Sequence, residues 1–312
     1  MEFDIFKQRR TDILIPPTAT VPQYAGLSLP FVNDATCDSK GFEVALGYTK
    51  TINNDFRFNI GGNFSYAHSN VVNINEPSNT LEWQKSTGKP IRAGFGAANG
   101  LLYEAIGIYR TAADLTQYPH LSNAVLGDLI FKDVNNDGVI DGSDRIRPTK
   151  TNTPEIIYGI NLGATYKNWD LAMLWQGAAR VWQYAFFEGG AGGIGNYTQL
   201  SFDNRWTPDN INSSGPRLFD RENASSALPN TYWVKNTSYT RLKNLMLSYS
   251  LPKSIISKLS ISSLRIFVSG TNLLTFTGIK DLDPEATASN QNYAGWYNPQ
   301  MKIYNFGLNV TF

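Results

Sequence analysis

The sequence predicts an all-β fold, built from antiparallel strands of the kind that form a transmembrane β-barrel. Large apolar residues alternate with small polar residues in about eight segments, and short connections alternate strictly with long ones. The composition agrees, because 26 glycines suit a turn-rich β protein and charged residues make up only 17% of the chain. The sequence has no run of about 18 apolar residues that would predict a transmembrane helix. Barrel strands need only about ten alternating residues.

The last residues of the chain show the alternation most clearly. One face of this predicted strand carries the large residues Tyr304, Phe306, Leu308, Val310 and Phe312, and the other face carries small polar residues. Such a strand suits a barrel wall that has lipid on its large side and water on its small side. The other predicted strands are residues 1–6, 42–48, 56–66, 156–166, 169–176, 239–251 and 264–275, where Leu174 breaks the alternation.

The lengths of the connections give these strands an orientation. The short connections are residues 50–54, 167–168 and 252–260, and the long ones are residues 8–40, 70–154, 177–236 and 278–299. Outer-membrane barrels have short periplasmic turns and long extracellular loops, whereas a Greek-key sandwich mixes both lengths at each end. Residues 101–110 and 128–132 are also strand-like. The long connection 70–154 begins and ends on the extracellular side, so it must contain an even number of membrane-spanning strands. Either both of these segments span the membrane or neither does, and we predict that both lie above it.

Two cations fall in phase with the residues that we expect to face lipid. At the outer rim, Arg241 and Lys243 could pair with lipid phosphates. A β-bulge that shifts the phase of the strand 239–251 explains them equally well.

Residues 133–144 match the pattern of a calcium-binding loop. Oxygen-bearing side chains stand at positions 1, 3, 5, 9 and 12 of the pattern, and glycine stands at the sharp turn in position 6. The candidate ligands are Asp133, Asn135, Asp137, the carbonyl of Val139, Asp141 and Asp144. Position 12 is aspartate rather than a bidentate glutamate, so the predicted calcium site is weak and structural. The alternative is a loop of Asx-turns whose side chains serve backbone geometry alone.

Catalysis and nucleic-acid binding find little support in the sequence. A net charge of +1 gives no field that would attract nucleic acid. The single Cys37 excludes an internal disulfide framework. His68 and His120 stand without Cys, Asp or Glu at the spacing of metal ligands or a catalytic triad, so we expect rim or loop positions for both.

Acidic and aromatic residues in the predicted loops leave two weaker hypotheses open. The pairs Asp281/Asp283 and Asp220/Glu222 could imitate the two acids of a glycosidase. Loop aromatics could stack on sugars or hold a partner protein, although packing and an interfacial girdle explain them better. These aromatics are Trp182, Tyr184, Tyr197, Trp206, Tyr232, Trp233, Trp296 and Tyr297.

Ordered motifs give the chain a family resemblance. They are YEAIGIY at 103–109, GDLIFKDVNNDGVID at 127–141, YGINL at 158–162, WTP at 206–208, YTRLKNL at 239–245, LRIFVSGTNL at 264–273 and FGLNVTF at 306–312. Through these motifs, essentially the whole chain resembles the C-terminal third of a SusC/RagA-type TonB-dependent outer-membrane transporter.

The resemblance implies the C-terminal strands of a 22-stranded barrel that is plugged by an N-terminal domain. It implies import of oligosaccharides or peptides driven through TonB, a SusD-like lipoprotein over the extracellular mouth, and the outer membrane of a Gram-negative bacterium. It also implies that the barrel-assembly machinery reads the terminal strand, 304–312. Because a signal peptide, a plug and the first strands are absent from residues 1–312, we expect the C-terminal portion of a longer chain.

Two other classes of protein are weighed against a transporter. A secreted, calcium-stabilised, carbohydrate-binding β-sandwich would be soluble without detergent. A glycan-cleaving enzyme would need two carboxylates that converge in one cleft. The transporter hypothesis requires that residues such as Phe58, Tyr158 and Val310 face hydrocarbon rather than a second layer of this chain.

Overall fold

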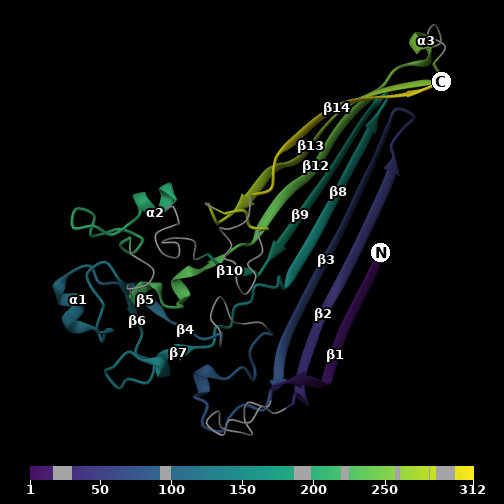
Figure 1. Cartoon of the computed structure of the whole chain (residues 1–312). Helices are drawn as coiled ribbons and strands as arrows, with labels where there is room; N and C mark the ends of the chain where they lie inside the picture. Colours follow the sequence, from purple (N-terminus) through teal and green to yellow (C-terminus); the bar gives the residue numbers. More distant parts are fainter. Residues whose placement is uncertain are drawn as a thin grey trace.

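One large antiparallel sheet dominates the structure, which is a computed structural model. The structure describes residues 1–16, 30–91, 100–185, 198–218, 225–256, 261–280, 282–285 and 299–312. The eight strands of the large sheet are β1 (Glu2–Ile15), β2 (Val32–Thr51), β3 (Phe56–Asn73), β8 (Ile156–Tyr166), β9 (Trp169–Ala179), β12 (Tyr239–Ser250), β13 (Ser263–Thr277) and β14 (Ile303–Thr311). They lie side by side in chain order, as Figure 1 shows. Each of the eight predicted strands is therefore present in this sheet.

The three short connections lie together at one end of the sheet. The turn between β8 and β9 contains only Lys167 and Asn168, and the turn between β2 and β3 spans residues 52–55. The connection from β12 to β13 carries the short helix α3 (Lys253–Ile256), which lies near the C-terminus (Figure 1). The long connections emerge at the opposite end, as predicted.

The predicted connection 8–40 is wrong in its extent, because much of it is strand. β1 continues to Ile15 and β2 begins at Val32, and these two residues pair with each other. The paired extension carries charged groups, such as the exposed ion pair between Arg9 and Asp38 (2.7 Å). A strand with polar residues on both faces lacks the alternation from which we predicted strands, so its length could not be read from that pattern.

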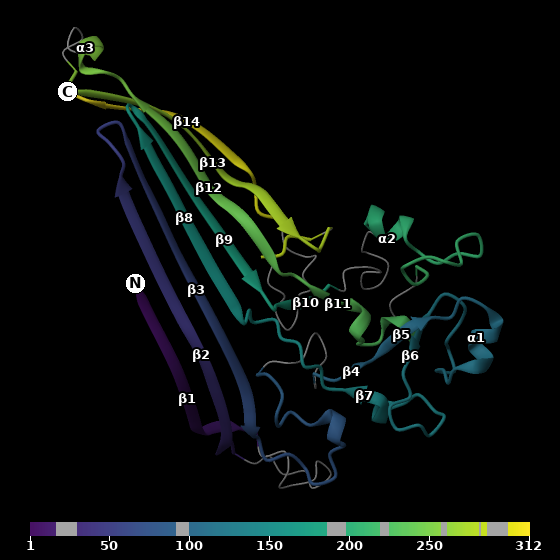
Figure 2. The ribbon, with the colours of Figure 1, turned by 180° about the vertical axis from the view of Figure 1, so that it is seen from behind.

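The long connections form a second region, here called the loop module, beyond the end of the sheet that lies opposite the short connections (Figures 1 and 2). Its elements are η2 (Glu82–Gln84), β4 (Leu102–Tyr103), β5 (Ala105–Ile108), α1 (Ala112–Gln117), β6 (Leu129–Phe131), η3 (Gly142–Asp144), β7 (Arg145–Ile146), β10 (Trp182–Tyr184), α2 (Gln199–Asp203), η5 (Ser225–Ala227), η6 (Thr231–Trp233) and β11 (Val234–Asn236). β4 pairs with β7, β5 with β6, and β10 with β11. Residues 101–110 and 128–132 therefore lie outside the large sheet, in agreement with the prediction that neither is a spanning strand; their position above the membrane stays a prediction.

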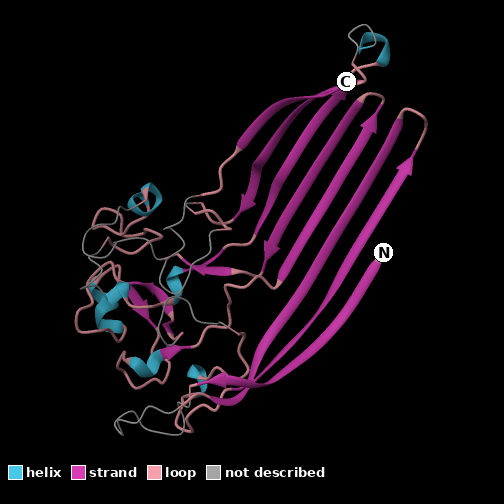
Figure 3. Ribbon diagram, turned by 45° about the vertical axis from the view of Figure 1, so that its right-hand side comes forward, coloured by secondary structure: helices cyan, strands magenta, loops and turns pink. Residues whose placement is uncertain are grey.

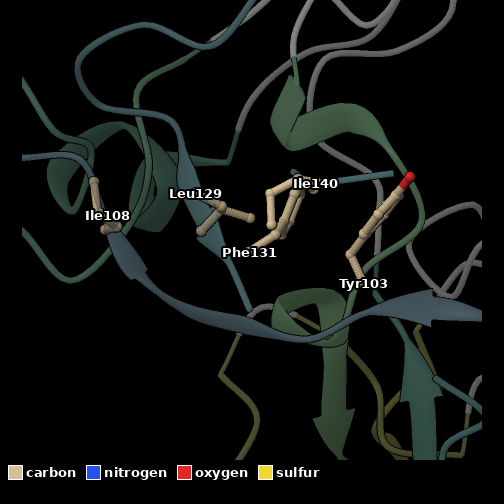
Figure 4. Close-up of a cluster of buried hydrophobic side chains, with 5 residues drawn as sticks. All are labelled: Tyr103, Ile108, Leu129, Phe131 and Ile140. Atoms are coloured by element: carbon tan, nitrogen blue, oxygen red, sulfur yellow. The ribbon is translucent and has the colours of Figure 1, made fainter. Parts of the chain in front are cut away.

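Most of the buried apolar side chains belong to the loop module rather than to the large sheet. Tyr103, Ile108, Leu129, Phe131 and Ile140 form one such core (Figure 4). The rings of Tyr103 and Phe131 stack with their centroids 4.9 Å apart. A second core joins β4 to β10 and η6 and is formed by Leu102, Tyr184, Trp233 and Val234. The module thus has a protein interior of its own.

The large sheet is a single layer. In the part of the chain that the structure describes, no second layer covers it, as the views in Figures 2 and 3 show. Phe58 and Tyr158 are only partly buried, and Val310 is exposed. The requirement that these residues do not pack into a second layer of this chain is therefore met.

Among the described residues, no helix is long and apolar enough to cross a bilayer.

Candidate functional site

The apolar face of the large sheet is continuous from strand to strand. Residues paired in neighbouring strands share a face, so the register shows which side chains line up across the sheet. One row consists of Tyr48, Ile60, Leu162, Met173, Leu245, Gly270 and Tyr304. The terminal strand adds its large residues to the same face, and they stay exposed: Tyr304 66%, Phe306 85%, Leu308 64% and Val310 41%, followed by Phe312 at 90%. Exposed apolar area on this scale requires a non-aqueous partner.

A belt of aromatic residues crosses this face near the short connections. Phe56 pairs with Tyr166, Tyr166 with Trp169, and Trp169 with Tyr249. The ring centroids of Trp169 and Tyr249 lie 4.8 Å apart, and those of Phe56 and Tyr166 lie 6.4 Å apart. Aromatic residues at this height are typical of the boundary between hydrocarbon and water.

The opposite face of the sheet is polar. Ser65 donates a hydrogen bond to Glu43, Thr165 donates to Asp170, and Arg265 donates to Ser248. Glycines make room for amides on this face, since a Cβ at Gly159 would lie 2.6 Å from the side-chain oxygen of Asn63. The predicted division into an apolar and a polar face is present in the sheet. Leu174, which breaks the alternation in the sequence, is an apolar residue on the polar face, where it pairs with Asn161.

A β-bulge in β12 decides the placement of Arg241 and Lys243. The register of β12 shifts between Leu242 and Asn244 against both of its neighbours, and Lys243 is the extra residue of the bulge against β9. Leu242 therefore pairs with Trp175 on the apolar face, and Arg241 faces the polar side. The bulge hypothesis is confirmed and the lipid-phosphate hypothesis is wrong for Arg241, because its side chain is only 3% exposed and is paired with carboxylates.

These carboxylates come from the connection between β13 and β14. Arg241 donates hydrogen bonds to Asp283 (2.8 Å), to Glu285 (2.5 Å) and to Thr275 (3.0 Å). Glu285 also accepts from Lys243 (3.2 Å). Burial acts to raise the pKa of Asp283, but hydrogen bonds from the Glu285 and Gln300 N–H groups and from Arg241 lower it overall. The network anchors this connection to the polar wall.

The first half of the predicted calcium loop is held by side chains that accept from its own backbone. Asp133 accepts from the N–H groups of Asp137 (3.2 Å) and Gly138 (2.8 Å). Asn135 accepts from Asp137 N–H (3.1 Å), and Asp137 accepts from Val139 N–H (2.9 Å). Gly138 has a φ of 82°, which explains the glycine at the sharp turn.

The second half of the calcium loop is closed in the same way. Asp144 is fully buried and accepts from the N–H groups of Val134 (2.8 Å) and Asp141 (2.9 Å). Asp141 accepts from Ser143 N–H (2.7 Å). Within the described ranges, no three Asp, Glu, His or Cys side chains are grouped so that they could hold a metal ion. The geometry is that of the Asx-turn alternative, and calcium binding remains a prediction.

The structure gives His68 a partner that sequence spacing did not reveal. His68 Nδ1 lies 2.6 Å from Glu155, which also pairs with Arg180 at 2.9 Å. These residues stand where β3, β8 and β9 meet the loop module, so the expected rim position of His68 is confirmed. His120 Nδ1 lies 3.3 Å from the Tyr118 carbonyl in a loop, as expected.

The glycosidase-like carboxylate pairs receive no support from the described residues. Asp283 forms an ion pair with Arg241, while Asp281, Asp220 and Glu222 lie outside the described residues. Among the loop aromatics, Trp182, Tyr184 and Trp206 pack against the module cores. Tyr197, Trp296 and Tyr297 lie outside the described residues.

A cavity of about 630 Å³ opens between the loop module and the end of β13. Its described lining includes Tyr232 and Trp233, whose rings meet edge to face with centroids 4.8 Å apart, and Trp233 is only 1% exposed. Lys235 lies over the Tyr232 ring, with Nζ 4.0 Å from the centroid. Residues 278–280 and Leu282 also line it, shortly before the anchored residues Asp283 and Glu285. Sequence reasoning named Tyr232 and Trp233 but not the cavity that they line.

The fold and the site together define a class of protein: a single-layer antiparallel sheet with one apolar and one polar face, joined to a folded loop region. No family model matches the chain. TonB-dependent receptor P3 of Formosa agariphila is 28% identical over 338 residues, which take in all of this chain and 32% of the relative. TonB-dependent receptor P26 of the same organism is 23% identical over 333 residues, again covering all of this chain and 32% of the relative.

Solved structures agree with this likeness in fold. The RagAB peptide importer in its open-open state aligns with a TM-score of 0.72 and 24% identity, over 99% of this chain and 32% of that chain. The structure of the RagAB peptide transporter aligns with a TM-score of 0.70 and 23% identity, over 99% of this chain and 33% of that chain.

The chain is therefore related to TonB-dependent receptors, and the resemblance predicted from its motifs is confirmed. It spans about a third of the length of the curated relatives that it matches. These relatives are receptors and transporters, not enzymes.

Proposed function

We propose that the protein forms part of the barrel wall of a TonB-dependent importer in the outer membrane of a Gram-negative bacterium. In this proposal its strands are the C-terminal strands of a 22-stranded barrel, and the chain acts with an N-terminal plug that these residues do not include. The cargo is an oligosaccharide or a peptide, and a SusD-like lipoprotein covers the loop module. The relationship to TonB-dependent receptors and the fold shared with RagAB support this assignment.

The single-layer sheet with one apolar face is the observation that carries the proposal. In the register of β13 and β14, Val268 pairs with Phe306 on the apolar face, and Ser269 pairs with Asn305 on the polar face. A sandwich would cover Phe306, but its side chain is 85% exposed. Only a barrel in lipid covers the apolar residues with hydrocarbon and still hydrates the polar ones.

Spin labels on neighbouring residues test this arrangement. In a Cys37→Ser background, the variants Val268→Cys and Ser269→Cys each carry one label in outer-membrane vesicles. We expect the label at 268 to collide with dissolved oxygen and the label at 269 to collide with a water-soluble nickel chelate. Equal access of the chelate to both labels would refute the membrane assignment.

Import itself is tested in cells. Deletion of the gene should abolish uptake of a labelled oligosaccharide or peptide, and cells that lack TonB should show the same defect. Uptake that continues in both strains would contradict an energised importer. Co-purification of a lipoprotein with the loop module intact, and its loss without the module, would support the proposed partner.

A further inference from the structure

We propose that a pair of neighbouring lysines, Lys7 and Lys40, binds the phosphate groups of a lipid in the outer leaflet of the membrane. The proposal rests on the membrane assignment made above, in which the end of the sheet with the long connections is the extracellular end. It adds a lipid partner to that assignment. The register of the strands, the height of the two lysines and their charge carry it.

The register places both lysines on the apolar face of the sheet. Ile5 pairs with Phe42 on that face, and two residues away in each strand Lys7 pairs with Lys40. The register of β1 against β2 has no shift between these two rows. Side chains two residues apart point to the same side of a strand, so the lysines continue the apolar face beyond its last apolar row.

The outer edge of the apolar face can be located from β3. Phe56 lies in the aromatic belt near the short connections, and Tyr66 follows about ten residues later in the same strand. Ten residues at about 3.3 Å each, tilted by about 45°, rise about 23 Å along the membrane normal, close to the height of about 25 Å of a barrel's apolar band. The rings of Tyr66 and Phe42, whose centroids lie 5.9 Å apart, thus mark the outer boundary. The row of Lys7 and Lys40 lies about 5 Å further out, at the level of the lipid headgroups.

The charge of this row is not balanced by the chain. Lys7 and Lys40 are directly opposite and repel each other, both are exposed, and among the described residues neither forms an ion pair. Asp38, in the next row, accepts from Arg9 with both oxygens (2.7 Å each) and lies within electrostatic range of Lys7. One carboxylate thus stands among three cations. Residues 17–29, which lie outside the described residues, contain no Asp or Glu.

The unbalanced charge is confined to β1 and β2. On the other side of Lys40 the register places His68, whose Nδ1 lies 2.6 Å from Glu155. Glu155 also pairs with Arg180 at 2.9 Å. The carboxylate of Glu155 therefore balances the cation of Arg180. An external anion is needed only between Lys7 and Lys40, where it would replace repulsion by attraction.

The apolar row next to the lysines favours a lipid over free phosphate. Ile5 is 75% exposed and Phe42 is 37% exposed, so both offer apolar surface beside the ammonium groups. A molecule with a phosphorylated headgroup and acyl chains contacts the lysines and this apolar surface at once. Free phosphate contacts the lysines alone.

Native mass spectrometry of the protein purified from outer membranes in non-ionic detergent tests the proposal. The probes are diphosphorylated lipid A, the same lipid A without its phosphates, and inorganic pyrophosphate. We expect diphosphorylated lipid A to bind at least about tenfold more tightly than the other two. Lys7→Gln and Lys40→Gln should each weaken its binding about fivefold, because a lysine near an anionic lipid contributes about 1 kcal/mol. The double variant should lose about 25-fold, and the double arginine variant should retain the affinity.

Lys50→Gln is the matched control. Lys50 is an exposed lysine of the same strand and the same face, but it pairs with Phe58 at the end with the short connections. Its loss should leave the affinity unchanged. Equal binding of lipid A with and without phosphates, equal binding of pyrophosphate, an unaltered affinity in the double glutamine variant, or the same loss in Lys50→Gln would each overturn the proposal. The spin-label pattern at residues 268 and 269 does not depend on these lysines, so a failure here is distinguishable from a failure of the membrane assignment.

Discussion

Placing a charge on the apolar face at the middle of the membrane should be far more costly than placing the same charge on the polar face. Ile160 and Asn161 are neighbours in β8 that point to opposite faces. Ile160 pairs with Gly62 and Trp175 on the apolar side and is 40% exposed. Asn161 pairs with Gly61 and Leu174 on the polar side. The variants Ile160→Arg and Asn161→Arg thus test the two faces at one height.

The structure places Ile160 near the middle of the apolar band. The aromatic belt at Tyr166 marks one boundary, and six residues of strand at about 3.3 Å each span about 20 Å. With a tilt of about 45°, this corresponds to about 14 Å along the membrane normal, close to half of a band about 25 Å tall. Arginine at the midplane of a barrel's lipid face costs about 2–4 kcal/mol. The same residue on the wet face should cost less than about 1 kcal/mol.

Urea unfolding in lipid vesicles, followed by tryptophan fluorescence, measures both costs. We expect the unfolding midpoint of Ile160→Arg to fall well below that of Asn161→Arg, with little change in the slope. Equal shifts in the two variants, or a larger shift in Asn161→Arg, would refute the assignment of the faces.

Three further predictions concern the loops. Arg241→Met should lower the free energy of unfolding by about 3–5 kcal/mol in the same assay, because it leaves the Asp283 carboxylate buried without its cation, while Glu285 keeps only Lys243. Arg9→Ala, which breaks an exposed ion pair, should leave the free energy of unfolding unchanged. Because the pKa of Asp283 is lowered in the folded protein, its contribution to stability should be complete above about pH 4 and disappear as the pH falls through the lowered value, which a pH series of unfolding curves would show. Asp137→Ala should abolish calcium binding in calorimetry, and the absence of calcium heat in the unaltered protein would end the calcium hypothesis.

The strands of the large sheet were predictable wherever the two faces meet different solvents. Residues 156–166 alternate because one side is apolar and the other is wet, and the observed β8 has the same limits. The outer part of β1 and β2 gave no such signal, because water reaches both of its faces. The triplet Leu129–Phe131 was recognised as strand-like, but its burial on all sides depends on the core that it shares with Tyr103 and Ile108.

The candidate site was less predictable than the sheet. A bulge at Lys243 can be suspected because Arg241 and Lys243 interrupt the alternation of apolar and polar residues. The sequence alone explains these two cations equally well by contact with lipid phosphates. The partners of Arg241 lie 42 and 44 residues further along the chain, and nothing in local spacing connects them. His68 and Glu155 are 87 residues apart and meet only because β3 pairs with β8. Contacts of this kind are set by register rather than by sequence pattern.

The agreement between chain order and strand order has a consequence for how such a sheet is made. Every strand pairs with the strand before it, so the sheet can grow by adding one hairpin at a time. The largest interruption, between β3 and β8, is a segment whose residues pack with one another and with residues of the later connection between β9 and β12. The entropic cost of closing a loop grows only slowly with its length, so a connection of this size adds little to the penalty for pairing β8 with β3. A sheet built in this way can carry large loops at one end and keep a strand order that follows the chain.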